Sequence, residues 1–235
     1  MKKLIIGLNE GIAIFLLIIL SFTSPVKAQT NSDGSSPQFL YPDFTKSTVR
    51  MKNGQSQSTI LNYNTVSEKM VYQKDDKLYD MVYTEMIDTV FLQDSKFVPV
   101  GKVFYEVLLV APVALFVQYK GELAPPGTPA AYGGTSQVSN TKLMSTVQLS
   151  SGYYNLKLPA DYLVITSQVY WIRKDSSMNS FVKEKQFLKI FPGKEAELKQ
   201  FIKQNRIKFD NQSDMVKLAE YFNEMAGQRK APLMK

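Results

Sequence analysis

The stretch VFYEVLLVAPVALFVQYKGEL, residues 103–123, carries the strongest β-strand pattern in the chain. In its second half Leu115, Val117 and Tyr119 alternate with the residues between them, which become polar toward Lys120, and this is the period of two expected of a strand. Pro112 cannot donate a ladder hydrogen bond, so the run is divided there into two strands. The stretch therefore predicts that an antiparallel sheet is the main element of the fold.

Further strand-like segments lie on both sides of this stretch. Upstream, KMVYQKDDKLYDMVY and DTVFLQDSKFVPVG each carry a predicted hairpin turn, at residues 75–77 and 93–95, and STILNYN precedes them. Downstream, TKLMSTVQLSSGYYNLKL and DYLVITSQVYWIRKD resume the strand pattern. The segment SFVKE is expected to pair back across residues 176–179.

The period of the pattern then changes to that of helices. Three apolar stripes follow at helical spacing: Phe187, Leu188 and Phe191; Leu198, Phe201 and Ile202; Met215, Leu218, Ala219, Phe222 and Met225. Pro192-Gly193 ends the first helix, and Ser213 is the predicted N-cap of the third, with Asp214 in its first turn. Isolated helices this short are marginal in water, so we expect them to dock on the sheet.

These patterns predict a mainly β protein with a C-terminal α region. The antiparallel sheet is expected to be curved, or an incomplete barrel, closed by the C-terminal helices, and a β-sandwich is the alternative topology. We expect a flexible leader at residues 29–45, a β region at 46–184 that contains a long loop at 123–141, and a helical region at 185–226 packed on it.

Residues 1–28 have the pattern of an export signal. Lys2 and Lys3 precede an apolar stretch, and the sequence before Ala28 suits a signal peptidase, which predicts cleavage between Ala28 and Gln29. The uninterrupted apolar run from Gly11 to Phe22 has 12 residues, whereas a membrane-spanning helix needs about 20. We therefore expect an exported protein of a Gram-negative-type bacterium, in the periplasm or at the cell surface, without a transmembrane anchor after signal removal.

The composition excludes several classes of enzyme. The chain has no histidine and no cysteine, which removes Ser-His-Asp and Cys-His catalysis, thiol redox chemistry and the ordinary zinc sites. We expect no metal and no cofactor. Two S-x-x-K matches, Ser139 with Lys142 and Ser180 with Lys183, are about the number expected by chance, and the companion motifs of Ser-Lys enzymes are missing.

Carboxylate chemistry stays open as the enzymatic alternative, because glycoside hydrolysis requires only two Asp or Glu side chains facing one bond. Five acidic residues lie in or beside the strand region: Glu85, Asp88, Asp94, Glu106 and Glu122. Nothing in their spacing distinguishes a pair. We therefore assign no catalytic residue and expect a non-enzymatic protein.

The loop PPGTPAAYGGTSQVSN, residues 125–140, is the candidate binding segment. It lacks the lysine and the following helix that a phosphate-binding loop requires. From Leu123 to Thr141 the chain carries no charge, and loops of this length are commonly functional or disordered. The candidate ligand-binding residues for a neutral glycan or peptide are six: Tyr132, Gly133, Gly134, Thr135, Ser136 and Gln137. The alternative is a folded flap over a sheet edge.

The positive charge of the chain is concentrated near its C-terminus. Residues 173–235 hold fourteen lysines and arginines against eight acidic residues. Such a surface attracts anions, and export makes nucleic acid an unsuitable partner. An anionic lipid surface is therefore an alternative partner for the basic helices, and solvated helix faces are the simpler interpretation.

Three segments, LNYNTVSEKMVYQ, YGGTSQ and the tail FLKIFPGKEAELKQFIKQNRIKF, resemble those of a family of exported, functionally uncharacterised bacterial proteins. The resemblance implies export and a single conjoined domain, and it implies no substrate, cofactor or catalytic residue. Together these observations predict a non-catalytic envelope protein with a binding, assembly or structural role. Its expected partner is another envelope component, which is a protein, a glycan or an anionic lipid.

Overall fold

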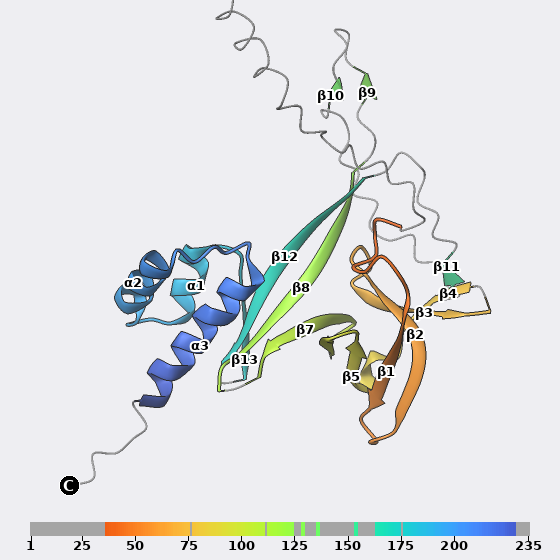
Figure 1. Cartoon of the computed structure of the whole chain (residues 1–235), viewed down its shortest axis with the longest axis horizontal. Coiled ribbons are helices and arrows are strands. Elements are labelled where there is room, and N and C mark those ends of the chain that lie inside the picture. The colour runs from red at the N-terminus through yellow and green to blue at the C-terminus, as the bar shows by residue number, and fades with distance from the viewer. Residues whose placement is uncertain are drawn as a thin grey trace, which may run out of the picture. The chain divides into compact units, whose positions relative to one another are not determined.

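A computed structural model describes residues 36–75, 77–110, 112–124, 128–129, 135–136, 153–154, 163–174 and 176–228 of the chain. The main element is one antiparallel sheet of 11 strands in the order β11-β4-β3-β2-β1-β5-β6-β7-β8-β12-β13. The sheet is curved and not closed, with β11 and β13 at its edges (Figure 1). The predicted antiparallel fold is confirmed, and a single sheet replaces the two sheets of the alternative sandwich.

The first strands are β1 (Thr45–Met51), β2 (Ser56–Asn64), β3 (Lys69–Lys74), β4 (Lys77–Asp80), β5 (Ile87–Leu92), β6 (Ser95–Val100) and β7 (Val103–Leu109). A short 3-10 helix, η1 (Thr84–Met86), joins β4 to β5. The later strands are β8 (Ala114–Ala124), β9 (Thr128–Pro129), β10 (Thr135–Ser136), β11 (Tyr153–Tyr154), β12 (Leu163–Lys174) and β13 (Ser177–Phe181). Strands β9 and β10 form a separate two-stranded pair among the described residues.

The division of residues 103–123 at Pro112 is confirmed, because β7 ends at Leu109 and β8 begins at Ala114. All three predicted hairpin turns are tighter than expected. Lys74 pairs with Lys77, so the first turn holds only residues 75 and 76. Leu92 pairs with Ser95, so the turn holds only Gln93 and Asp94, and Lys174 pairs with Ser177, so β13 begins three residues before Ser180. Gln93 and Ser176 take positive φ angles of 52° and 68°, the conformation that lets a two-residue turn follow the twist of its strands.

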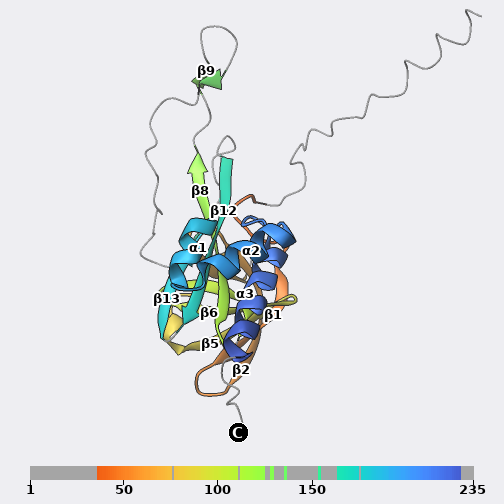
Figure 2. The same ribbon diagram turned by 90° about the vertical axis from the view of Figure 1, so that its left-hand side faces the viewer.

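Three helices follow the sheet: α1 (Glu184–Ile190), α2 (Glu195–Asn205) and α3 (Gln212–Gln228). Figure 2 looks onto the helices and shows them in front of the strands. Their apolar stripes form one core with the inner face of the sheet, since Phe187, Leu198 and Leu218 belong to the same buried cluster as Leu115 and Val117. The predicted docking of the helices on the sheet is confirmed.

The predicted N-cap of α3 is wrong by two residues. The helix begins at Gln212, and the Asn211 side chain accepts a hydrogen bond from the Asp214 N–H at 3.0 Å, so Asn211 is the cap and Ser213 lies inside the first turn. Asparagine caps as well as serine, so composition did not distinguish the two. Asp214 lies in the first turn, as predicted.

The turn between β2 and β3 is hydrogen-bonded to two strands that are not its neighbours in the sheet, β7 and β8. Its Thr65 carbonyl accepts a hydrogen bond from Gly121 N of β8 at 2.8 Å, and its Glu68 carbonyl accepts one from Phe104 N of β7 at 3.1 Å. Gly121 is required by this approach, because a Cβ atom there would lie 2.5 Å from Thr65 Oγ1. Two strands from the other half of the sheet, β7 and β8, are thereby bonded to the turn that follows β2, and this contact fixes the curvature.

Within the described residues, no helix has the length and apolar character needed to cross a membrane. The expected signal and residues 29–35 of the expected leader lie outside those residues, and so does the strand-like segment 141–158 apart from β11.

Candidate functional site

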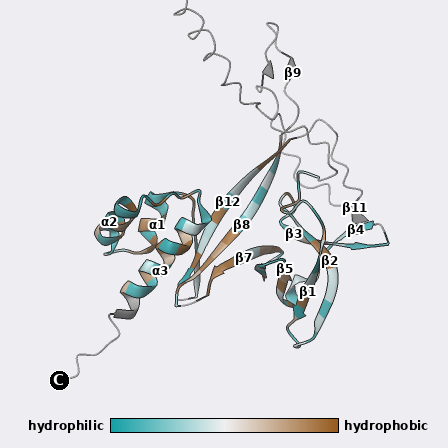
Figure 3. Cartoon of the chain, viewed as in Figure 1, coloured by the Kyte–Doolittle hydropathy of each residue, from teal (hydrophilic) through white to brown (hydrophobic). Residues whose placement is uncertain are grey.

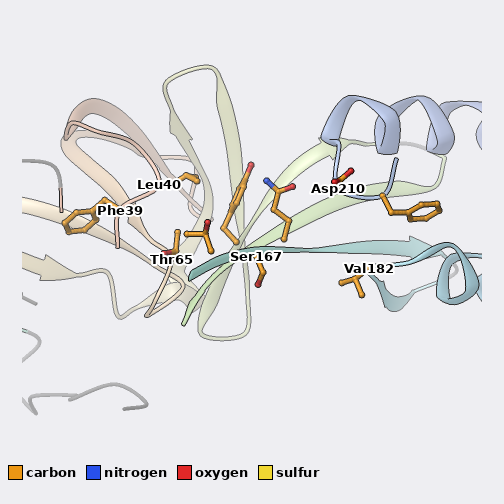
Figure 4. A pocket seen from close by; sticks show the side chains of 10 residues that line it. Phe39, Leu40, Thr65, Ser167, Val182 and Asp210 are labelled. Carbon is orange, nitrogen blue, oxygen red and sulfur yellow. The ribbon is translucent and has the colours of Figure 1, made fainter. Parts of the chain in front are cut away.

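A pocket of about 660 Å³ opens between the helices and the first residues of the described chain (Figure 4). Strands β8 and β12 contribute Tyr119, Thr166, Ser167 and Gln168. The remaining lining residues come from other parts of the chain: Phe39, Leu40, Thr65, Val182, Phe209 and Asp210. Figure 4 shows Phe39 and Leu40 on one side and Val182 and Asp210 on the other. The pocket thus joins residues that are far apart in the sequence.

Phe39 and Leu40 form one wall of the pocket, and this segment is hydrogen-bonded to the end of β2 and the turn after it. Leu40 N donates to the Tyr63 carbonyl at 2.9 Å, and the Gln38 carbonyl accepts hydrogen bonds from Thr65 N at 2.8 Å and from Thr65 Oγ1 at 3.0 Å. These bonds occupy the end of β2 and the turn after it, which β1 does not reach, since the pairing of β1 with β2 ends at Leu61. Residues 38–40 are therefore bonded in place beside the pocket.

The floor is set by the register of β8 and β12, which places Gln168 opposite Tyr119 and Thr166 opposite Gly121. Thr166, Ser167 and Gln168 are exposed. Thr166 and Gln168 point to the inner face of β12, whereas Ser167, between them, points to the other face at the rim of the pocket. Gln168 Oε1 accepts a hydrogen bond from the Tyr170 hydroxyl at 2.8 Å. Burial, reinforced by the negative charge of Asp210, raises the pKa of Tyr170 to about 12, so this hydroxyl keeps its proton at neutral pH.

A chain of hydrogen-bonded polar groups, buried at Glu106 and Tyr119 and partly buried at Ser95 and Tyr41, lies beneath the pocket. Glu106 accepts hydrogen bonds from the Tyr119 hydroxyl at 2.5 Å and from the Ser95 hydroxyl at 2.6 Å, and Ser95 accepts one from Tyr41 at 3.1 Å. Burial raises the pKa of Tyr119, and the hydrogen bond and charge of Glu106 raise it further. Glu106 is only 7% exposed, so both of its oxygens serve as acceptors inside the protein.

The other predicted carboxylates do not form a common site. Asp88 binds Arg50 at 2.7 Å, and hydrogen bonds from Thr89 and Arg50 hold its pKa below the usual value. Glu85 lies on η1, Asp94 in the β5–β6 turn and Glu122 on β8, and all three are exposed. Among the described residues, no group of three or more acidic side chains is placed to hold a metal ion.

Most of the predicted binding loop lies outside the described residues. Thr135 and Ser136 form β10, whereas Tyr132, Gly133, Gly134 and Gln137 lie outside the described residues. The expected cleavage site at Ala28 and Gln29 and the Ser139–Lys142 match lie outside them too. In the second S-x-x-K match, Ser180 lies in β13 and Lys183 directly precedes α1, and both are exposed.

Sequence reasoning missed the pocket, although one signal for it exists. The segment Thr166-Ser167-Gln168 interrupts an apolar strand with three consecutive polar residues, which strict alternation does not produce. Phe209 and Asp210 gave no signal, because they lie between two helices and reach the pocket only through the packing of those helices.

Comparison of the chain with family models, with curated proteins and with solved structures finds no match. The resemblance to exported bacterial proteins therefore stays a prediction.

Proposed function

We propose that the protein is a non-catalytic binding protein of the bacterial envelope that holds a neutral, hydroxyl-rich ligand, a glycan, in the pocket above β8 and β12. The observation that carries the proposal is the composition of the pocket lining. It combines short hydroxyl and amide side chains with aromatic rings and a single carboxylate.

This lining suits a sugar. Thr166 and Gln168, on the same face of β12, offer both hydrogen-bond donors and acceptors, which is what a ring bearing several hydroxyls requires. The rings of Phe39 and Phe209 offer apolar surface to the C–H faces of the ligand. Asp210 can accept two hydroxyl hydrogen bonds, one at each carboxylate oxygen. A pocket of about 660 Å³ lies within the usual range for small-molecule sites.

The arrangement favours binding over hydrolysis. Two-carboxylate hydrolysis requires two acidic groups that face the same bond. Asp210 is the one carboxylate among the lining residues, while Glu106 lies beneath Tyr119 with both oxygens hydrogen-bonded. We therefore assign Glu106 the role of supporting Tyr119 in the pocket floor.

The test is calorimetric titration of the protein with fractionated envelope glycans. Thr166→Phe fills the pocket from an exposed strand position and should abolish the binding heat. Gln57→Phe, an equally exposed strand position that lines a different hollow, is the matched control and should leave binding unchanged. Equal binding by both variants would contradict the proposal. Release of shorter sugars that is lost in Asp210→Asn would instead support the hydrolase alternative.

The proposed location has its own test. Cell fractionation followed by N-terminal sequencing should find the mature chain outside the cytoplasm, beginning at Gln29. Recovery of the chain in the cytoplasm with residues 1–28 intact would exclude the envelope role. For the anionic-lipid alternative, salt-sensitive sedimentation with vesicles that disappears without residues 194–235 is the distinguishing result.

A further inference from the structure

The outer face of the sheet, opposite the helices, carries a second apolar cluster. Tyr105, Ala114 and Phe116 are buried there, and partly buried side chains pack around them: Val98, Val100, Val103, Val107, Trp171 and Met178. Strands β6, β7, β8, β12 and β13 supply these residues. Figure 3 shows the apolar character of β7 and β8. Within the described part of the chain no helix covers this face, since the apolar stripes of the helices join the inner core.

A hollow of about 380 Å³ opens in this face, apart from the proposed glycan pocket. Its walls include Val98, Val107, Phe116 and Met178. Val110, at its edge, is 61% exposed, which is unusual for an aliphatic side chain beside other apolar residues. The hollow therefore offers apolar surface that solvent reaches, and it is large enough for an alkyl chain.

The hollow is also positively charged. Lys52, Lys96 and Arg173 line it, and no carboxylate forms an ion pair with any of these three among the described residues. Arg173 instead lies over the Phe116 ring, 5.3 Å from its centroid. Asp88 is the one acidic lining residue, and it is already bound to Arg50 at 2.7 Å. Lys96 also interacts electrostatically with Asp88. The hollow thus combines an apolar interior with three cations and one carboxylate, so its net charge is positive.

We infer that this hollow binds a single-chain anionic amphiphile, with the alkyl chain against the valines and the phosphate, sulfate or carboxylate head among Lys52, Lys96 and Arg173. A neutral alkyl ligand would leave the excess positive charge of the hollow unmatched, and a small anion would leave the apolar walls in water. A second copy of the chain is disfavoured, because a symmetric contact would bring identical cations together. The site does not depend on the proposed glycan pocket.

Trp171 provides a local probe, because it is the only tryptophan of the chain. It lies directly across from Phe116 in the β8–β12 pairing and stacks on Tyr105 with ring centroids 5.5 Å apart. Its Nε1–H donates to Gln118 at 2.8 Å, so the ring is held in one orientation. A ligand that occupies the hollow beside Phe116 should change its emission.

The experiment is a titration of the full-length mature protein with n-octyl phosphate below its critical micelle concentration, followed by Trp171 fluorescence. We expect a saturable change in emission. 1-Octanol has the same chain without charge and without a sugar, and should bind at least about fivefold more weakly, as should the Lys96→Gln/Arg173→Gln variant toward octyl phosphate. Inorganic phosphate should give no saturable change.

Lys199→Gln/Lys203→Gln on α2 is the matched control and should leave binding unchanged. Val110→Asp places a carboxylate at the exposed edge and should abolish binding, while circular dichroism reports whether each variant is folded. The inference is overturned if 1-octanol binds equally well or if the α2 variant weakens binding as much as the Lys96/Arg173 variant. A response to anionic vesicles with none to octyl phosphate would also overturn it. Binding that survives in Thr166→Phe separates this site from the glycan pocket.

Discussion

The two faces of the strands β7, β8 and β12 are both apolar, yet they have different surroundings. On the inner face Phe104, Leu115 and Val117 are fully buried in a core shared with the helices. On the outer face Trp171, Val107 and Met178 stay partly exposed, and cations surround them. Apolar side chains on a strand therefore serve two purposes here. The covered face stabilises the fold, and the uncovered face is available for contact.

The largest effect is expected at the centre of the covered face. Phe187 is 1% exposed and contacts the rings of Phe181, Phe191 and Phe209. Phe187→Ala should lower the free energy of unfolding by about 3–5 kcal/mol in urea denaturation, because it leaves a cavity between α1 and the sheet. Lys185→Ala, on the exposed side of the same helix, is the control. A loss below about 1 kcal/mol for Phe187→Ala would show that the helices are not part of the main core.

A smaller effect is expected where the β2–β3 turn meets β8. The Cβ of Gly121→Ala would lie 2.5 Å from Thr65 Oγ1 and 2.9 Å from Val164 Cγ1, so one of them must shift. We expect a loss of about 1–3 kcal/mol, measured by denaturation. Part of that loss should be recovered in the Thr65→Ala background, which removes the nearer atom. Strictly additive losses would argue against the contact.

The Tyr63 hydroxyl should contribute about 1–2 kcal/mol. It lies 3.2 Å from the Phe104 carbonyl and 3.1 Å from the Tyr119 carbonyl, in a fully buried position. Tyr63→Phe keeps the ring stacked on Phe97 but leaves these carbonyl groups without that donor. Thermal denaturation measures the change, and Tyr79→Phe on β4 is a half-buried comparison that should cost less.

Stability should also fall at high pH, because of the inner-face tyrosines. The pKa of Tyr170 is about 12 in the fold against 10.0 for an unperturbed tyrosine, so the folded state holds this proton more tightly. That contribution is complete below pH 10 and is lost as pH rises from 10 to 12. Tyr170→Phe should therefore flatten the pH dependence in that window. An unchanged slope would mean that Tyr170 does not titrate with folding.

The smallest effect is expected on the uncovered face. Arg173→Gln removes an exposed charge and its contact with Phe116, and should change the free energy of unfolding by no more than about 0.5 kcal/mol. A loss of several kcal/mol would show that the outer face is also essential to folding, and it would weaken the contrast between the two faces.

The sequence predicted the parts of the fold that depend on local periodicity. The strand division at Pro112, the hairpin around residue 75 and the three helical stripes follow from alternation, turn residues and helical spacing. Boundaries set by single hydrogen bonds were less predictable. The turns at Gln93 and Ser176 were shorter than expected, and the cap of α3 moved from Ser213 to Asn211.

The two proposed sites depend on contacts that periodicity does not report. Phe39, Tyr119 and Asp210 meet in one pocket only because the sheet curves and the α2–α3 connection reaches it. The outer hollow combines Lys52 with Arg173, which are more than a hundred residues apart. Glu106 was recognised as a candidate carboxylate, but its burial beneath Tyr119 could not be predicted from spacing.

The most direct test of the central claim, that the pocket above β8 and β12 is the binding site, is a map of backbone amide chemical shifts during titration with the glycan fraction that binds. The account predicts that the largest changes fall at residues 166–168 and at Phe209 and Asp210, with β6 and Met178 unaffected. Changes confined to the outer face, or spread evenly over the helices, would contradict it.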